Sequence, residues 1–130
     1  MSAFVRWFED YSVTYVDDTT WIEVDARNAL NVSPFGLGQF VIRTRAWNVS
    51  SGTGNLKVQF ETSVDGEYWR RHSGFAALTP SNPDGQVIIS DMDTTDEPLS
   101  RYVRPVFIGN DGTSGSASVL VTILALLKHG

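Results

Sequence analysis

The chain has 130 residues, a formal net charge of −5 and no cysteine. This length suits a single domain, residues 1–130, with a core of its own, and the missing cysteines exclude disulfides, thiolate catalysis and cysteine-ligated metal sites. No basic run stands out, so neither nucleic acid nor an anionic membrane is an expected partner.

Apolar and polar residues alternate along much of the chain, and turn residues interrupt the alternation at short intervals. Period two is the spacing of side chains on one face of a β-strand, and many short strands are typical of sandwiches. We therefore expect an all-β fold: a two-sheet antiparallel β-sandwich, jelly-roll-like, with about eight strands. The segments with strand character are 11–16, 20–24, 39–47, 56–64, 68–72, 86–90, 101–108 and 117–128.

The first ten residues are unusually apolar for a chain end, with Phe4, Trp7 and Phe8 close together. Free termini tend to be polar and mobile, so residues 1–10 are a candidate N-terminal docking arm. The same segment has no basic region followed by an apolar stretch, and it therefore does not resemble a signal peptide.

The segment 39–47 carries one aromatic side chain that breaks its pattern. Its alternation places Trp47 on the polar side, so we expect an exposed ring or one covered by a neighbouring subunit. The residues expected to face the core are Phe40, Ile42, Thr44 and Ala46.

The segment 56–64 has the clearest alternation of the chain and is followed by a turn motif. Lys57, Gln59, Glu61 and Ser63 are expected to face solvent, and Asp65-Gly66 forms a tight turn in which Gly66 accepts a positive φ. The loop at 51–55 is interpreted as the hairpin connection to the preceding strand. The residues expected to face the core are Leu56, Val58, Phe60, Thr62 and Val64.

The last segment, 117–128, is apolar on both faces. Its β-branched run disfavours a helix, so we expect a central strand that is covered on both sides, in part by a neighbouring subunit. Leu124 and Leu126 belong to the second face, together with Leu120. The first face consists of Val119, Val121, Ile123 and Leu127.

The sequence offers little chemistry. His72 lies beside two arginines, and we interpret it as a strand-surface residue rather than a base, because the sequence identifies no partner for it. His129 is penultimate, and neither a nucleophile elbow nor a phosphate-binding loop is present. The acidic stretch from Asp91 to Glu97 contains oxygen ligands that suit Ca²⁺, but its spacing matches no EF-hand, so a solvated acidic loop is the simpler interpretation. We expect no enzyme activity and no cofactor.

Two stretches resemble known sandwich motifs. The run from Phe60 to Trp69 resembles the Ser-x-Asp-Gly-x-x-Trp hairpin of discoidin-like and galactose-binding-like jelly rolls, and Arg101-Tyr102-Val103-Arg104 resembles the strand that follows in that architecture. The pattern is also similar to that of small β-sandwich accessory proteins of tailed-phage virions, such as capsid decoration and tail proteins. The extracellular discoidin pattern usually carries a cysteine pair, which this chain lacks.

These observations favour a non-enzymatic structural protein. The resemblance implies a phage or phage-like virion decoration or accessory protein, located in the virion and assembled in the host cytoplasm. Its expected partners are copies of itself, with a trimer as one candidate, and a capsid or other virion protein. The alternative is a carbohydrate-binding module that uses exposed aromatic side chains. The candidate interface residues are Phe4, Trp7, Phe8, Trp47, Leu124 and Leu126.

Overall fold

A computed structural model of the chain describes residues 2–16, 22–26, 28–33, 35–49, 55–78, 86–91, 100–110 and 116–128. Every regular element in these ranges is a β-strand. The strands are β1 (Ser2–Val16), β2 (Ile22–Ala26), β3 (Leu30–Asn31), β4 (Leu37–Val49), β5 (Asn55–Ser63), β6 (Arg70–Leu78), β7 (Gln86–Asp91), β8 (Tyr102–Asn110) and β9 (Ser116–Lys128).

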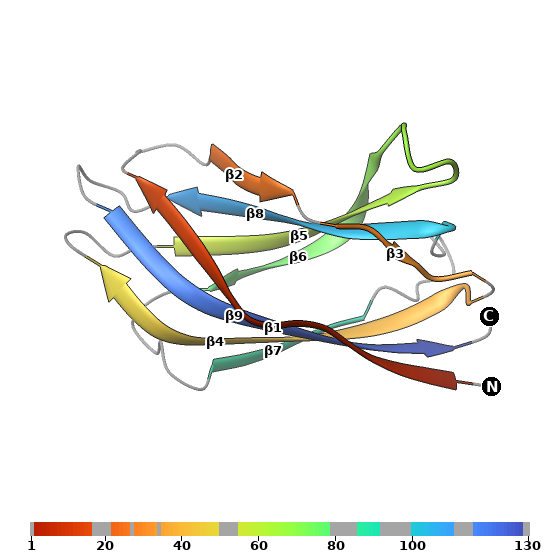
Figure 1. Cartoon of the computed structure of the whole chain (residues 1–130), viewed down its shortest axis with the longest axis horizontal. Coiled ribbons are helices and arrows are strands. Elements are labelled where there is room, and N and C mark those ends of the chain that lie inside the picture. Colours follow the sequence, from red (N-terminus) through yellow and green to blue (C-terminus); the bar gives the residue numbers. More distant parts are fainter. Residues whose placement is uncertain are drawn as a thin grey trace.

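The strands form two antiparallel sheets that face each other (Figure 1). Sheet A has the order β1-β9-β4-β7, and sheet B has the order β2-β8-β5-β6 with the two-residue β3 added beside β8. Consecutive strands alternate between the sheets except in sheet B, which contains both β2 and β3 and both β5 and β6. This double-sheet arrangement is a jelly roll, so the predicted fold class is confirmed.

The core lies between the two sheets and is rich in aromatic rings. Phe40 of β4 and Phe60 of β5 meet with ring centroids 4.6 Å apart, and Trp7 of β1 lies beside both. Gly109 of β8 sits under the ring of Tyr15, where an added Cβ would come within 2.5 Å of a ring carbon. Close packing of this kind makes core substitutions costly. The fully buried large side chains include Phe40, Ile42, Leu56, Phe60, Phe107 and Ile123.

Strand β9 is central, as its two-faced pattern predicts. It pairs with β1 from Ser2↔Lys128 to Val16↔Ser116 and with β4 from Leu37↔Lys128 to Val49↔Ala117. Its predicted first face is buried in the core, whereas Leu124 and Leu126 on the second face are only half-buried.

Residues 2–10 are the first part of β1 and pair with the end of β9. Trp7 and Phe8 pack against the core, whereas the side chain of Phe4 is 63% exposed. Within one chain this segment is therefore a sheet strand. Whether it also docks on a neighbouring copy stays a prediction.

The expected hairpin at residues 51–55 is wrong. Strands β4 and β5 belong to different sheets, so this connection crosses from sheet A to sheet B. Two strong alternating segments separated by a short loop look alike in the sequence whether they pair directly or face each other across a core, because both arrangements bury one face of each strand.

Strand β4 contains an irregularity that reverses the predicted side of two residues. Ala46 has a φ of 57° and an exposed side chain, and the pairing register shifts between Arg45 and Asn48. A bulge adds one residue to a strand and thereby changes which side chains face the core. Trp47 consequently packs against the core, with its indole nitrogen donating to Thr44 Oγ1 at 3.2 Å.

Strand β5 and the residue after it follow the predicted alternation with three exceptions. Ser63, which was expected to face solvent, is buried, and its Oγ accepts a hydrogen bond from the backbone N–H of Gly66. Leu56, Val58 and Phe60 are fully buried. Gln59 is also buried, because its side chain lies against the guanidinium of Arg71, from which its amide oxygen accepts a hydrogen bond. Val64 is 74% exposed because the strand ends at Ser63.

Candidate functional site

The outer face of sheet A carries an apolar patch, which we define as Phe4, Val41, Leu120, Leu124 and Leu126. In the strand register Phe4 lies opposite Leu126, and Val41 lies opposite Leu124, so three adjacent strands contribute to one surface. Phe4 is largely exposed and the four aliphatic side chains are half-buried. Aliphatic side chains on the solvent side of a sheet are typical of a surface that another molecule covers.

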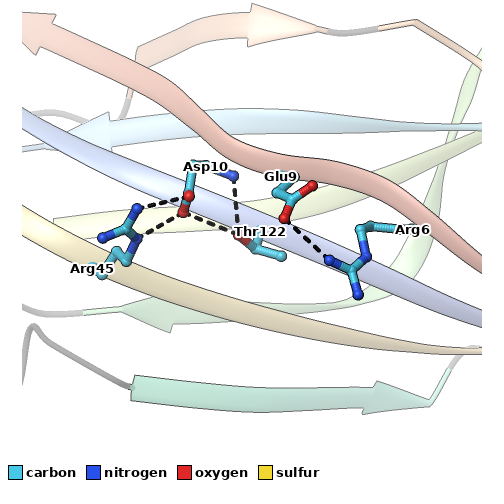
Figure 2. Close-up of polar contacts among 5 residues, drawn as sticks. All are labelled: Arg6, Glu9, Asp10, Arg45 and Thr122. Atoms are coloured by element: carbon cyan, nitrogen blue, oxygen red, sulfur yellow. Dashed lines mark hydrogen bonds and ion pairs between the residues drawn. The ribbon is translucent and has the colours of Figure 1, made fainter.

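A polar cluster crosses the same face at the centre of β9 (Figure 2). Arg45 of β4 donates from Nε and Nη2 to the two carboxylate oxygens of Asp10 on β1, both at 2.7 Å. The backbone N–H of Asp10 donates to Thr122 Oγ1 of β9 at 3.0 Å. The hydrogen bond from Arg45 is the main reason that the pKa of Asp10 lies below its usual value of 3.8.

Bulges bring these groups together. The register of β1 shifts between Arg6 and Phe8 and again between Phe8 and Tyr11, and Asp10 takes a φ of 49°. Aspartate tolerates this left-handed conformation better than most residues. Because Arg45 lies at the start of the β4 bulge, irregular positions of β1 and β4, the two strands that flank β9, meet over β9.

A hollow of about 320 Å³ lies in this face beside the polar cluster. Arg6 and Glu9 pair across 3.1 Å at its edge, with both side chains mostly exposed. Val41 and Leu124 give the hollow an apolar part, so it combines aliphatic surface with charged groups. Its lining residues are Arg6, Glu9, Asp10, Val41, Arg43, Thr122 and Leu124.

The turn between β5 and β6 is the second unusual surface. Asp65 Oδ1 accepts from the backbone N–H groups of Glu67 at 2.8 Å and Tyr68 at 3.0 Å, and Ser63 Oγ accepts from Gly66 N at 2.8 Å. The N–H groups of Tyr68 and Glu67 lower the pKa of Asp65. Gly66 has the predicted positive φ, 84°. The turn exposes two large apolar side chains, Val64 at 74% and Tyr68 at 80%.

The outer face of sheet B is different, because its polar groups satisfy one another. Arg104 Nη2 lies 2.7 Å from Glu61 Oε1, and both side chains are mostly buried. The Arg104 guanidinium also stacks over Trp69 at 4.3 Å from the ring centroid. Trp69 is therefore half-buried by contacts within its own chain.

No metal site is evident in the described part of the chain, where no group of three His, Cys, Asp or Glu side chains lies close enough to hold a metal ion. His72, which was expected on a strand surface, is instead fully buried in β6. Residues 92–97 of the acidic stretch, the side chain of Asp91, and His129 lie outside the described residues. No helix within the described ranges is long and apolar enough to cross a membrane.

The predicted interface residues divide into two sets. Phe4, Leu124 and Leu126 come together in the apolar patch on sheet A. Trp7, Phe8 and Trp47 pack against the core of the same chain. Two surface features were not predicted from the sequence. They are the position of Arg43 at the hollow and the exposure of Tyr68, which was assigned to a strand. The Asp-Gly turn motif just before Tyr68 was the available signal for its exposure.

Comparisons with known proteins show the fold. No protein-family description and no curated protein matches the chain. A chain in the structure of infectious bursal disease virus, Gx strain, is similar over 100% of this chain, with a TM-score of 0.51 and 16% identity. A chain of the T13 IBDV viral particle matches over the same length at 16% identity, with a TM-score of 0.40. This chain spans 32% and 36% of those two chains.

Proposed function

We propose that this protein is a non-enzymatic structural component of a virus particle. In its specific form, the proposal is a decoration or accessory protein of a phage or phage-like virion, which docks on the shell as a homo-oligomer after assembly in the host cytoplasm. Its partners are then copies of itself and a capsid or other virion protein.

The observation that carries this proposal is the apolar patch on the outer face of sheet A. In a strand with one face on the core and the other in water, apolar side chains that point inward normally alternate with polar side chains that point outward. Strand β9 instead places Leu120, Leu124 and Leu126 outward, beside Val41 and the exposed Phe4. Burial of such side chains at an interface contributes roughly 25 cal/mol per Å² of apolar surface.

The geometry of the edge strand supports association through the face of the sheet. Strand β1 is one of the two edges of sheet A, the other being β7, and its two register shifts and the left-handed Asp10 interrupt the β1 edge near its middle. Bulges on an edge strand hinder pairing with a strand of another molecule. The sheet face is therefore the better surface for a stable contact.

The virus-particle setting is supported by the fold. Double-sheet jelly rolls occur in viral capsid proteins and also in lectins and cupins. The similar chain from infectious bursal disease virus belongs to a virus structure. Neither fact assigns a role by itself, because one fold supports many functions.

The test compares Leu124→Lys with Thr14→Lys. Thr14 is exposed on the same sheet, away from the patch, and receives the same charge. Light scattering should show an oligomer for the wild type and Thr14→Lys and a monomer for Leu124→Lys, because a lysine ammonium resists burial. In a density gradient of lysate from the cells that encode the chain, the first two should sediment with particles. A wild-type protein that is monomeric and absent from every particle fraction contradicts the proposal.

A further inference from the structure

The β5–β6 turn has the properties of a preformed binding element. Its hydrogen bonds to Asp65 and Ser63 hold the backbone from Ser63 to Tyr68 in one shape. A rigid turn loses little conformational entropy when it binds, so an exposed aromatic side chain on it can contribute most of its burial to affinity. Tyr68 and Val64 are two of the three most exposed large apolar side chains in the described part of the chain.

The hollow on sheet A has an unequal distribution of charge. Its two acids are already paired, Glu9 with Arg6 and Asp10 with Arg45. Among the residues described, Arg43 makes no ion pair, and its guanidinium is exposed at the hollow. The hollow therefore presents aliphatic surface with one available cation beside it, in a chain whose net charge is −5.

The turn matches these features. Tyr68 offers a flat ring with a polar tip, which suits the aliphatic surface of Val41 and Leu124 and the neighbouring guanidinium groups. Glu67, the preceding residue, is exposed and offers a carboxylate to Arg43. We propose that the hollow on sheet A of one copy binds the β5–β6 turn of a second copy of this chain. This inference rests on the self-association in the proposed function.

The positions of the two surfaces set the symmetry of the contact. The turn lies at the end of the sandwich where β1 begins and β9 ends (Figure 1), whereas the hollow lies within the outer face of sheet A. Two different patches meet in this contact, so it is head-to-tail and generates a ring where the rotation closes. A ring of this kind includes the trimer considered from the sequence.

The experiment uses a reciprocal exchange of charge in the full chain. Arg43→Glu reverses a charge at the hollow and leaves the turn unchanged, and Glu67→Arg reverses a charge on the turn and leaves the hollow unchanged. Each variant alone should associate more than about tenfold more weakly than the wild type, as should Tyr68→Ser. The double variant Arg43→Glu/Glu67→Arg should regain association, because every altered turn then meets an altered hollow in a ring of any size. Glu23→Arg, at an exposed position of β2, is the control for the charge change.

Light scattering across a concentration series reads the wild type and every variant, and a thermal melt confirms that each variant is folded. Recovery of association in the double variant supports the inference. The inference is overturned if the single variants associate like the wild type, or if the double variant associates as weakly as they do. Suppose that Leu124→Lys loses association while Arg43→Glu, Glu67→Arg and Tyr68→Ser associate like the wild type. That result rejects this contact but leaves the proposed function intact. A monomeric wild type rejects both.

Discussion

The two outer faces of the sandwich differ in how they meet their surroundings. On sheet B, Glu61, Arg104 and Trp69 form a stack in which each polar group has a partner on the same chain. On sheet A, the patch around Leu124 and Leu126 has aliphatic side chains facing outward, and the Arg6–Glu9 pair beside it is mostly exposed. This cluster on sheet B is satisfied within its own chain, whereas the described part of sheet A exposes apolar side chains beside a solvent-exposed ion pair.

This difference separates folding from association. Both faces rest on one core, so the stability of a single chain depends on the inward side chains of either sheet. The outward side chains of sheet A add little to that stability, since they are only half-buried. Substitutions there should change association first, and substitutions at the neighbouring inward positions should change folding first.

The largest expected effect comes from two adjacent residues of β9 that point in opposite directions. Ile123→Ala removes a fully buried side chain and should lower the free energy of unfolding by about 2–5 kcal/mol. Leu124→Ala, on the outer face, should cost about 1 kcal/mol or less in the monomer while weakening association. Denaturant melts at low protein concentration measure the first quantity, and light scattering measures the second.

Similar losses of unfolding free energy for Ile123→Ala and Leu124→Ala would contradict the comparison. That result would mean that the outer face of sheet A is part of the folding core. Phe60→Ala is a positive control, because its fully buried ring belongs to the core that both sheets share.

The two faces of β9 could be predicted from the sequence because alternation is a local signal. Inward Ile123 and outward Leu124 follow from period two alone, and so does most of β5. The motif Asp65-Gly66 predicted a turn with positive φ because glycine accepts that conformation without steric cost. The candidate surface is predictable to the same extent: the sequence indicated Leu124 and Leu126 as a second apolar face.

The remaining errors have physical causes that a local pattern does not contain. Nothing about Ala46 signals a left-handed backbone, so the bulge that turns Trp47 inward could not be foreseen. The polar cluster beside the hollow consists of Asp10, Arg45 and Thr122, which come from three strands that are distant in sequence. The crossing from β4 to β5 depends on which strands pair, which is a property of the whole fold.

A smaller effect compares the ion pairs of the two faces. The side chains of Arg104 and Glu61 are 28% and 21% exposed, whereas those of Arg6 and Glu9 are 59% and 62% exposed. Glu61→Ala should therefore cost about 1 kcal/mol of unfolding free energy, and Glu9→Ala less than about 0.5 kcal/mol. A double-mutant cycle for each pair measures the coupling directly. Equal coupling energies in the two pairs would show that the outer faces do not differ in the strength of their ion pairs.

The smallest expected effect concerns two carboxylates held in different ways. The pKa of Asp10 is lowered mainly by the side chain of Arg45, and that of Asp65 mainly by the backbone N–H of Tyr68. Both folded pKa values lie below the ordinary value of 3.8. Each group therefore stabilises the fold above that pH, and the contribution is lost as the pH falls through the folded pKa.

Thermal melts between pH 5 and pH 2.5 should show this loss, and the asparagine variants should separate its two sources. Asp10→Asn and Asp65→Asn should each flatten the melting profile by lowering its neutral side towards the acid side, because the carboxylate that supplies the stability above its pKa is then missing at every pH. Added salt should reduce the contribution of Asp10, which depends on a charged partner at the surface, more than that of Asp65, which depends on backbone dipoles. An equal response to salt would mean that Arg45 does not hold Asp10 in solution. The polar cluster on sheet A would then be looser than the turn that we place in the hollow of the next copy.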